Sequence, residues 1–170
     1  MLRADNASPA EGVSEERVRE WLGDIPDPEI PVLSVTDLGI VRDVIVDGSS
    51  VLVEVAPTYS GCPATEVIEQ SILTELRGHG VNVSLKRVLS PPWTTDWITA
   101  AGRAKLLEYG IAPPLTGAGK REMLGALRSI NCPRCASTNT QLVSEFGSTA
   151  CKAAYKCKDC LEPFEYFKCL

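Results

Sequence analysis

The spacing of hydrophobic residues changes several times along this chain, and each change predicts a different element. Apolar residues recur at helical spacing behind Ser14, which can cap a helix. The prolines of residues 23–31 then require an extended or turning segment. Two runs rich in Val and Ile, residues 40–46 and 51–55, flank a polar turn that contains Gly48 and so predict a β-hairpin.

After the hairpin the spacing alternates between helical and extended. The apolar positions of residues 63–76 fall on one helical face, whereas residues 81–89 alternate between apolar and polar side chains. Residues 94–109 return to helical spacing. Three residues can cap this last helix: Thr94, Thr95 and Asp96. Because a strand, a helix and a strand in succession favour a right-handed crossover, the second and third strands should be parallel. The predicted fold class is α+β, a small mixed β-sheet packed with helices in the order α-β-β-α-β-α.

Two C-x-x-C pairs dominate the C-terminal region, with 21 residues between them. Each pair bends the chain into a knuckle that aims two sulfurs at one point, and two knuckles joined by a hairpin form a tetrahedral four-thiolate site. We therefore predict a C-terminal zinc ribbon, in which iron is an alternative metal and the site acts as a structural staple. Its ligands are Cys132, Cys135, Cys157 and Cys160. A redox role is disfavoured, because thioredoxin-type motifs occur singly.

Two further cysteines, Cys151 and Cys169, lie in the same region. The first falls between the knuckles and the second is next to last. One interpretation makes them a small buried apolar residue and a terminal thiol. The other makes them an alternative ligand pair or part of a site that handles a metal cluster. The sequence leaves both open.

These patterns divide the chain into four predicted segments. They are a flexible lead-in (1–13), an α+β domain (14–111), a linker (112–129) and a four-cysteine zinc-ribbon domain (130–170).

Composition narrows the classes of function. Hydrophobic residues make up 44% of the chain and charged residues 23%, which suits a packed core. The net charge is −5, with −6 on residues 1–128 and +1 on residues 129–170, so we expect no nucleic-acid partner. The sequence shows no apolar run of signal-peptide or membrane-spanning length. We therefore expect a cytoplasmic protein without membrane contact, whose thiols are reduced.

Cys62 stands apart from the other cysteines, at the point where the second predicted strand gives way to a helix. Pro63 suits the first helical position, which would make Cys62 the N-cap, where the helix dipole favours a thiolate. Gly61 leaves the thiol open, and Thr58 adds a hydroxyl nearby. The alternative is a small residue in a cramped turn. A thiol enzyme would need a base, and the single histidine, His79, falls at the far end of the predicted helix.

Three stretches, residues 27–41, 56–64 and 91–114, resemble the iron–sulfur cluster assembly family that includes SufT. The cysteine-rich tail narrows the resemblance to the PaaD family, the small accessory subunits of bacterial phenylacetyl-CoA epoxidase systems. Together these similarities cover about residues 15–170. They imply an iron–sulfur-assembly-like domain followed by the zinc ribbon.

The resemblance also implies a role. The epoxidase system acts on the aromatic ring of phenylacetyl-CoA in aerobic phenylacetate degradation, with an iron–sulfur flavin reductase and a di-iron oxygenase. The chain is expected to be a non-catalytic accessory and maturation factor that assists iron–sulfur cluster or iron assembly in those protein partners. The alternative is a structural subunit of the oxygenase complex with a zinc-ribbon docking surface.

Matching the family's motifs assigns candidate residues for handling the cluster. Asp27 and Glu29 come from "DPE", Asp37 from "TDLG" and Cys62 from "GCP". Thr58 lies beside the last of these motifs and joins the candidates. We expect transient binding of iron or of an iron–sulfur cluster at Cys62. Because one cysteine is too few ligands, a homodimer or the remaining cysteines would have to supply others.

Overall fold

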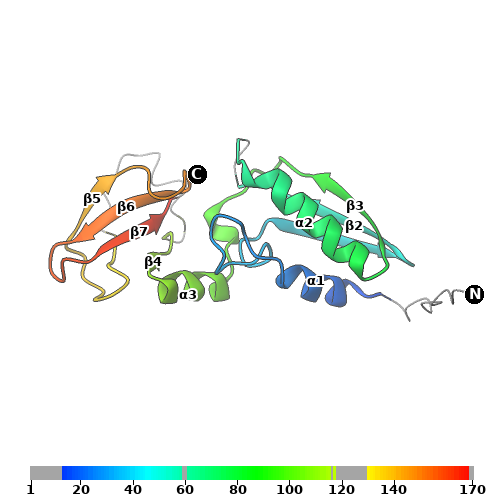
Figure 1. Ribbon diagram of the computed structural model, residues 1–170, viewed down its shortest axis with the longest axis horizontal. Coiled ribbons are helices and arrows are strands. Elements are labelled where there is room, and N and C mark those ends of the chain that lie inside the picture. The colour runs from blue at the N-terminus through cyan, green and yellow to red at the C-terminus, as the bar shows by residue number, and fades with distance from the viewer. Residues whose placement is uncertain (1–12, 59–60, 116, 118–129, 169–170) are drawn as a thin grey trace, which may run out of the picture.

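The computed structural model describes residues 13–58, 61–115, 117 and 130–168. Two β-sheets lie beside each other along the longest axis of the molecule, and α3 runs beneath the region between them (Figure 1). The predicted lead-in (except residue 13) and residues 118–129 of the predicted linker lie outside the described residues. Within the described ranges, no helix has the length and apolar character needed to cross a membrane.

The first sheet has the mixed topology that the sequence predicts. Its strand order is β1-β2-β3, with β1 and β2 antiparallel and β2 and β3 parallel. The strands are β1 (Val41–Asp47), β2 (Ser50–Val55) and β3 (Asn82–Arg87). The predicted hairpin and the parallel pair are therefore confirmed.

Two helices cover one face of this sheet. They are α1 (Glu15–Gly23) and α2 (Ala64–Gly78), and α1 packs against both α2 and β1. The Ser14 hydroxyl accepts a hydrogen bond from the Arg17 amide at 3.2 Å, which confirms the predicted cap of α1. On α2, the apolar stripe that includes Ile72 and Leu76 is fully buried. The amphipathic pattern thus places α2 across the strands (Figure 1).

The predicted helix over residues 94–109 is wrong in its first third. The structure has a short 3₁₀ turn, η1 (Thr95–Trp97), and then α3 (Ala100–Tyr109). The backbone of Ile98 between them is extended, and its side chain is only 4% exposed. Thr99 caps α3, and its amide donates to the Asp37 carbonyl at 2.9 Å. A contact with a distant loop therefore interrupts a segment whose local spacing is helical.

The second sheet has the strand order β4-β7-β6-β5. Its strands are β4 (Ile111–Ala112), β5 (Thr140–Ser144), β6 (Lys152–Cys157) and β7 (Pro163–Phe167). The three ribbon strands are antiparallel, whereas β4 pairs in parallel with β7. β4 directly follows α3, so the end of the first region takes part in the sheet of the second. The domain boundaries at residues 111 and 130 remain predictions.

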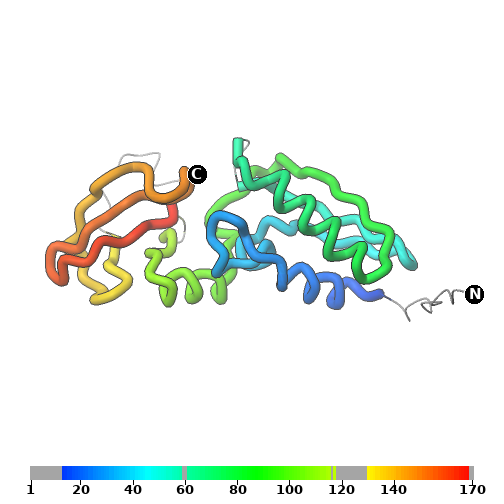
Figure 2. The backbone as a smooth tube through the Cα atoms, viewed as in Figure 1, coloured from blue at the N-terminus to red at the C-terminus, as the bar shows by residue number. Residues whose placement is uncertain are grey.

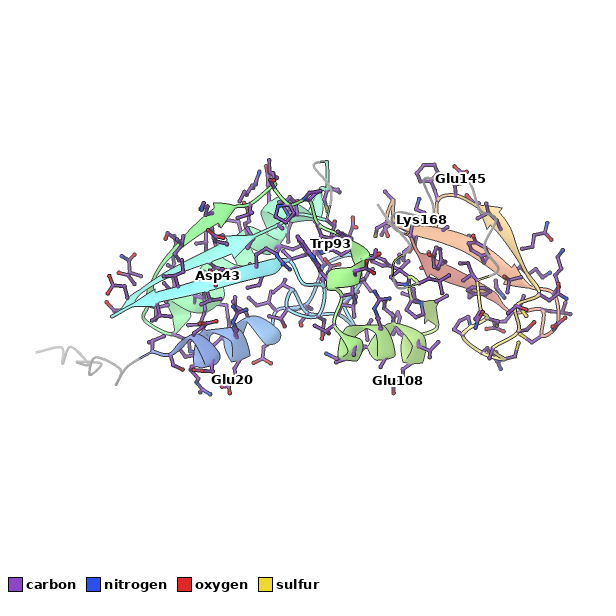
Figure 3. All side chains as sticks on the ribbon, turned by 180° about the vertical axis from the view of Figure 1, so that it is seen from behind. Glu20, Asp43, Trp93, Glu108, Glu145 and Lys168 are labelled. Atoms are coloured by element: carbon purple, nitrogen blue, oxygen red, sulfur yellow. The ribbon has the colours of Figure 1, made fainter. Side chains whose placement is uncertain are left out.

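Residues from both regions contribute to one hydrophobic core. β7 returns toward the middle of the molecule (Figure 2) and brings in Phe167, which is 2% exposed. Its ring packs edge-on against Trp93, with 6.3 Å between the ring centroids, and Trp93 lies between the two sheets (Figure 3). The Trp93 indole donates to the Leu38 carbonyl at 2.9 Å. Cys151, 5% exposed, belongs to the same buried cluster.

Shortening Phe167 should therefore destabilise the first region as well as the ribbon. We expect Phe167→Ala to lower the free energy of unfolding by roughly 3–5 kcal/mol, because it leaves a cavity in the shared core. Denaturant unfolding followed by tryptophan fluorescence measures this, since all three tryptophans precede residue 98. Phe146→Ala is the matched control, because Phe146 is 66% exposed and its loss should change stability by less than about 0.5 kcal/mol. Equal effects of the two variants would refute the shared core.

Candidate functional site

The four ribbon cysteines converge on one point. Their sulfurs all lie within 4.8 Å of one another. Cys132 Sγ is 3.7 Å from Cys160 Sγ, and Cys135 Sγ is 3.6 Å from Cys157 Sγ. Four thiolates around a zinc ion, with bonds of about 2.3 Å, would stand about 3.8 Å apart. The arrangement therefore fits a metal ion held by four thiolates, and we call it the four-cysteine group.

The two knuckles that carry these cysteines are built alike. The residue after each second cysteine, Ala136 or Leu161, has a positive φ, 58° and 66° respectively. This left-handed conformation is unfavourable for a residue with a Cβ, so the surrounding turns must hold it. The side chain of Asp159, in the second knuckle, accepts hydrogen bonds from Ser137 and Asn139, which follow the first knuckle. These bonds link the knuckles independently of a metal.

Backbone amides also favour the thiolate form within the four-cysteine group. The Cys160 amide donates to Cys157 Sγ at 3.5 Å, and this bond lowers the pKa of Cys157 to about 7. A metal ion binds the deprotonated sulfur, so the bond favours metal binding at neutral pH.

A pocket at the junction of the two regions brings together the candidate residues of the first region. It contains about 490 Å³ of empty space, solvent at its mouth included. Asp27, Glu29, Thr58 and Cys62 all line it. Cys151 and Phe167 close it from the ribbon side. We call it the Cys62 pocket.

The loop after α1 fixes both acidic residues of the Cys62 pocket. Asp27 Oδ1 accepts hydrogen bonds from the amides of Glu29 and Ile30, at 2.9 and 2.7 Å, and so closes a tight turn. Asp27 is only 6% exposed, and burial raises the pKa of its carboxyl group despite these two bonds. A buried carboxylate with a raised pKa is typical of functional sites. Glu29 is directed by this turn toward Cys151.

Cys62 lies one residue outside the position we predicted. Pro63 is the N-cap of α2 and already has helical backbone angles, so the prediction of Cys62 as N-cap is wrong. The reason is a tighter first turn, in which the Thr65 amide donates to the Cys62 carbonyl at 3.2 Å. No side chain caps α2. Cys62 remains half-buried at the edge of the pocket.

Cys151 is far from the four-cysteine group and belongs to the Cys62 pocket. It precedes β6, and the ligand Cys157 ends β6, which separates the two sulfurs by about 20 Å along the strand. Cys151 Sγ is 3.0 Å from Thr149 Oγ1 and 3.5 Å from Glu29 Oε2. Burial raises the pKa of the Cys151 thiol to about 11. Cys169 lies outside the described residues.

Glu69 also lines the Cys62 pocket, and no sequence motif pointed to it. Its carboxylate is held by Arg87 on β3, with 2.8 Å between Arg87 Nη2 and Glu69 Oε2. Only the helical face of α2 placed it, on the polar side, without any indication of a pocket.

Asp37, the fourth motif residue, does not line the Cys62 pocket. Although burial acts to raise its pKa, hydrogen bonds from Lys105 and Ser34 outweigh burial and lower it. The Lys105 ammonium lies 2.6 Å from Asp37 Oδ2. The nearby Gly39 has a φ of +67°, and a Cβ there would lie 2.4 Å from the Trp97 carbonyl oxygen. This motif therefore docks its loop against η1 and α3.

His79 stands at the wrong end of α2 to serve as a base for Cys62. It follows the last residue of α2, whereas Cys62 precedes the first, a separation of about 20 Å. Its ring stacks on Trp21, with 3.9 Å between centroids, and Nε2 lies 3.1 Å from Glu75 Oε1. The thiol-enzyme alternative gains no support from this arrangement.

The fold and these two sites define a chain that joins an iron–sulfur-assembly-type α+β fold to a metal-binding ribbon, and comparison with known proteins agrees. Residues 15–85 match the iron–sulfur cluster assembly protein family, and residues 116–168 match the PaaD zinc beta ribbon domain. An Escherichia coli (strain K12) protein, assigned as a component of 1,2-phenylacetyl-CoA epoxidase, is 51% identical over 150 residues, 88% of this chain and 89% of that protein. The chain belongs to the PaaD family.

Two solved structures share the fold of the first region. A DUF59 domain of unknown function from Bacillus anthracis is 23% identical with a TM-score of 0.51, over 54% of this chain and 90% of that one. A conserved hypothetical protein from Thermotoga maritima is 29% identical with a TM-score of 0.50, over 57% and 97%. Together with the four-cysteine group, these similarities confirm the predicted fold class of an α+β sheet and a zinc-ribbon-like tail.

The raised pKa of Asp27 predicts a cost in stability at neutral pH. The folded state holds the Asp27 proton more tightly than the unfolded state does, so stability is lost as the pH rises above 3.8, the ordinary value for aspartate. Asp27→Asn keeps the oxygen that accepts both amides and removes the charge. Its unfolding free energy relative to wild type should rise steadily between about pH 4 and about pH 7. Glu108→Gln, on an exposed face of α3, is the control; a pH-independent difference for Asp27→Asn would contradict the argument.

The four-cysteine group predicts a metal-dependent ribbon. Cys157→Ser should lose the metal that survives gel filtration and lose near-ultraviolet circular dichroism from Tyr155, Phe164 and Tyr166, since metal binding contributes to folding. Elemental analysis and circular dichroism measure the two effects. Lys158→Ala, an exposed change in the same knuckle, should leave both unchanged. Unaltered metal content in Cys157→Ser would exclude this group as the ligand set.

Proposed function

We propose that the chain is a maturation subunit of a phenylacetyl-CoA epoxidase that binds iron or an iron–sulfur cluster transiently in the Cys62 pocket and passes it to a catalytic subunit. The observation that carries the proposal is the convergence of Asp27, Glu29, Thr58 and Cys62 on one pocket, although they come from two separate loops and a helix start. Sulfur and carboxylate ligands together suit iron. The assignment to the epoxidase rests on the family relationship.

The weak hold that delivery requires follows from the composition of the pocket. Cys62 is half-buried rather than enclosed, so a ligand bound to it remains accessible to a client protein. Its neighbours are oxygen groups, which bind a cluster less firmly than the closed four-thiolate set of the ribbon does. The same contrast assigns the four-cysteine group to a permanent zinc ion, with iron as the alternative.

The clients in this proposal are the iron–sulfur reductase or the di-iron oxygenase component of the epoxidase. The chain itself performs no turnover, because the described residues place no histidine near Cys62 and the Glu69 carboxylate is held by Arg87. A cytoplasmic location, the absence of nucleic-acid and membrane partners and a homodimer remain predictions from the sequence.

A second candidate is a structural subunit of the oxygenase complex whose ribbon is a docking surface. The exposed edge of the second sheet favours it. Leu142 and Val143 on β5 are 43% and 66% exposed, and Phe146 beyond the strand is 66% exposed. Isolated apolar edges of this kind often pair with another protein. Stoichiometric co-purification with the oxygenase that Val143→Glu abolishes would favour this candidate over delivery.

The delivery function predicts a specific phenotype for Cys62→Ser. The chain should fold normally, because Cys62 is half-buried, but epoxidase activity and iron content of the client should fall severalfold in cells that carry only this variant. Gln70→Ala, on the exposed face of α2, should behave as wild type. Wild-type activity and client iron in Cys62→Ser would mean that the thiol serves packing alone.

A further inference from the structure

We infer that Cys151 is the second thiol ligand of the Cys62 pocket, so that the ribbon completes a binding site for a thiophilic divalent cation, such as Fe²⁺, that the assembly-type region begins. This inference rests on the proposed function and names the ligands and the ligand class of that same pocket. It also gives the ribbon a second role besides its own metal.

The first support is placement. Cys62 and Cys151 come from different regions of the chain, yet both line the same pocket. Cys151 is only 5% exposed, and the core residue Phe167 lines the pocket with it. A buried thiol at the base and a half-buried thiol at the mouth give a cation two sulfur ligands on different walls.

The second support is the charge inside the pocket. Asp27 is 6% exposed, and the amides of Glu29 and Ile30 both donate to its Oδ1; no residue of the described ranges donates to Oδ2. The nearest buried cation, Lys152, is already paired with Glu165 Oε2 at 3.0 Å. A buried carboxylate with one oxygen unpaired is costly unless a cation or donor meets it. A bound cation would supply that partner.

The third support is a route for the proton that metal binding displaces. A metal ion takes the place of the thiol proton, so Cys151 must release it. Glu29 Oε2 lies 3.5 Å from Cys151 Sγ and is placed to accept it. Two thiols with carboxylates select Fe²⁺, Co²⁺ or Zn²⁺ over Mg²⁺ and Ca²⁺, which prefer oxygen ligands alone.

The test is a titration of the zinc-loaded, full-length protein with Co²⁺ under anaerobic conditions, because thiolate–Co²⁺ bonds give a charge-transfer absorption. Wild type should bind a further cobalt ion while its ribbon zinc is retained. Cys151→Ser and Cys62→Ser should each lower the absorption per bound cobalt by about half and weaken binding about 10-fold or more. Thr149→Val keeps the Cys151 thiol and should retain the wild-type absorption. Wild-type absorption and affinity in Cys151→Ser would overturn the inference.

A measurement on the unaltered protein guards against a variant that fails to fold. Bound Co²⁺ should slow alkylation of both Cys62 and Cys151, whereas Mg²⁺ should protect neither. Protection of Cys62 alone would refute Cys151 as a ligand and leave the proposed function intact. Loss of cobalt binding in Cys151→Ser together with normal epoxidase maturation in cells would instead support this cation site and count against the delivery function.

Discussion

The contact between Phe167 and Trp93 is the constraint on which the rest of the structure depends. It fixes the last strand of the ribbon against the end of the first sheet, in a core that neither region forms alone. The pairing of β4 with β7 adds backbone hydrogen bonds to the same junction. The Cys62 pocket lies at this junction, so its shape depends on both regions being folded.

This arrangement couples the four-cysteine group to the pocket through a single strand. β6 ends at the ligand Cys157 and starts one residue after Cys151. Metal binding at the group contributes free energy to the folding of β6 and β7, which carry Cys151 and Phe167 to the pocket. A structural metal can therefore influence a distant site without any ligand in common, by stabilising the strands that wall it.

Local patterns account for most of the fold. The cap at Ser14, the Val-rich hairpin, the amphipathic α2 and the two knuckles are determined by neighbouring residues, and the sequence was enough to predict them. The break at Ile98 was missed because it depends on the Asp37 loop, which is distant in sequence but holds Thr99 in place. The site shows the same division. Family motifs identified Asp27, Glu29 and Cys62, whereas the proximity of Cys151 to Glu29 arises from packing between regions and had no sequence signal beyond an unassigned thiol.

The central claim is that the pocket passes iron to a catalytic component of the epoxidase, and a transfer experiment tests it most directly. The chain is loaded anaerobically with isotopically labelled Fe²⁺ and mixed with metal-free reductase or oxygenase in the presence of a chelator that captures free iron. After the proteins are separated, Mössbauer spectroscopy measures labelled iron in the client. The account predicts that one client acquires chain-bound iron despite the chelator and acquires almost none from free Fe²⁺. Equal labelling with and without the chain would contradict it.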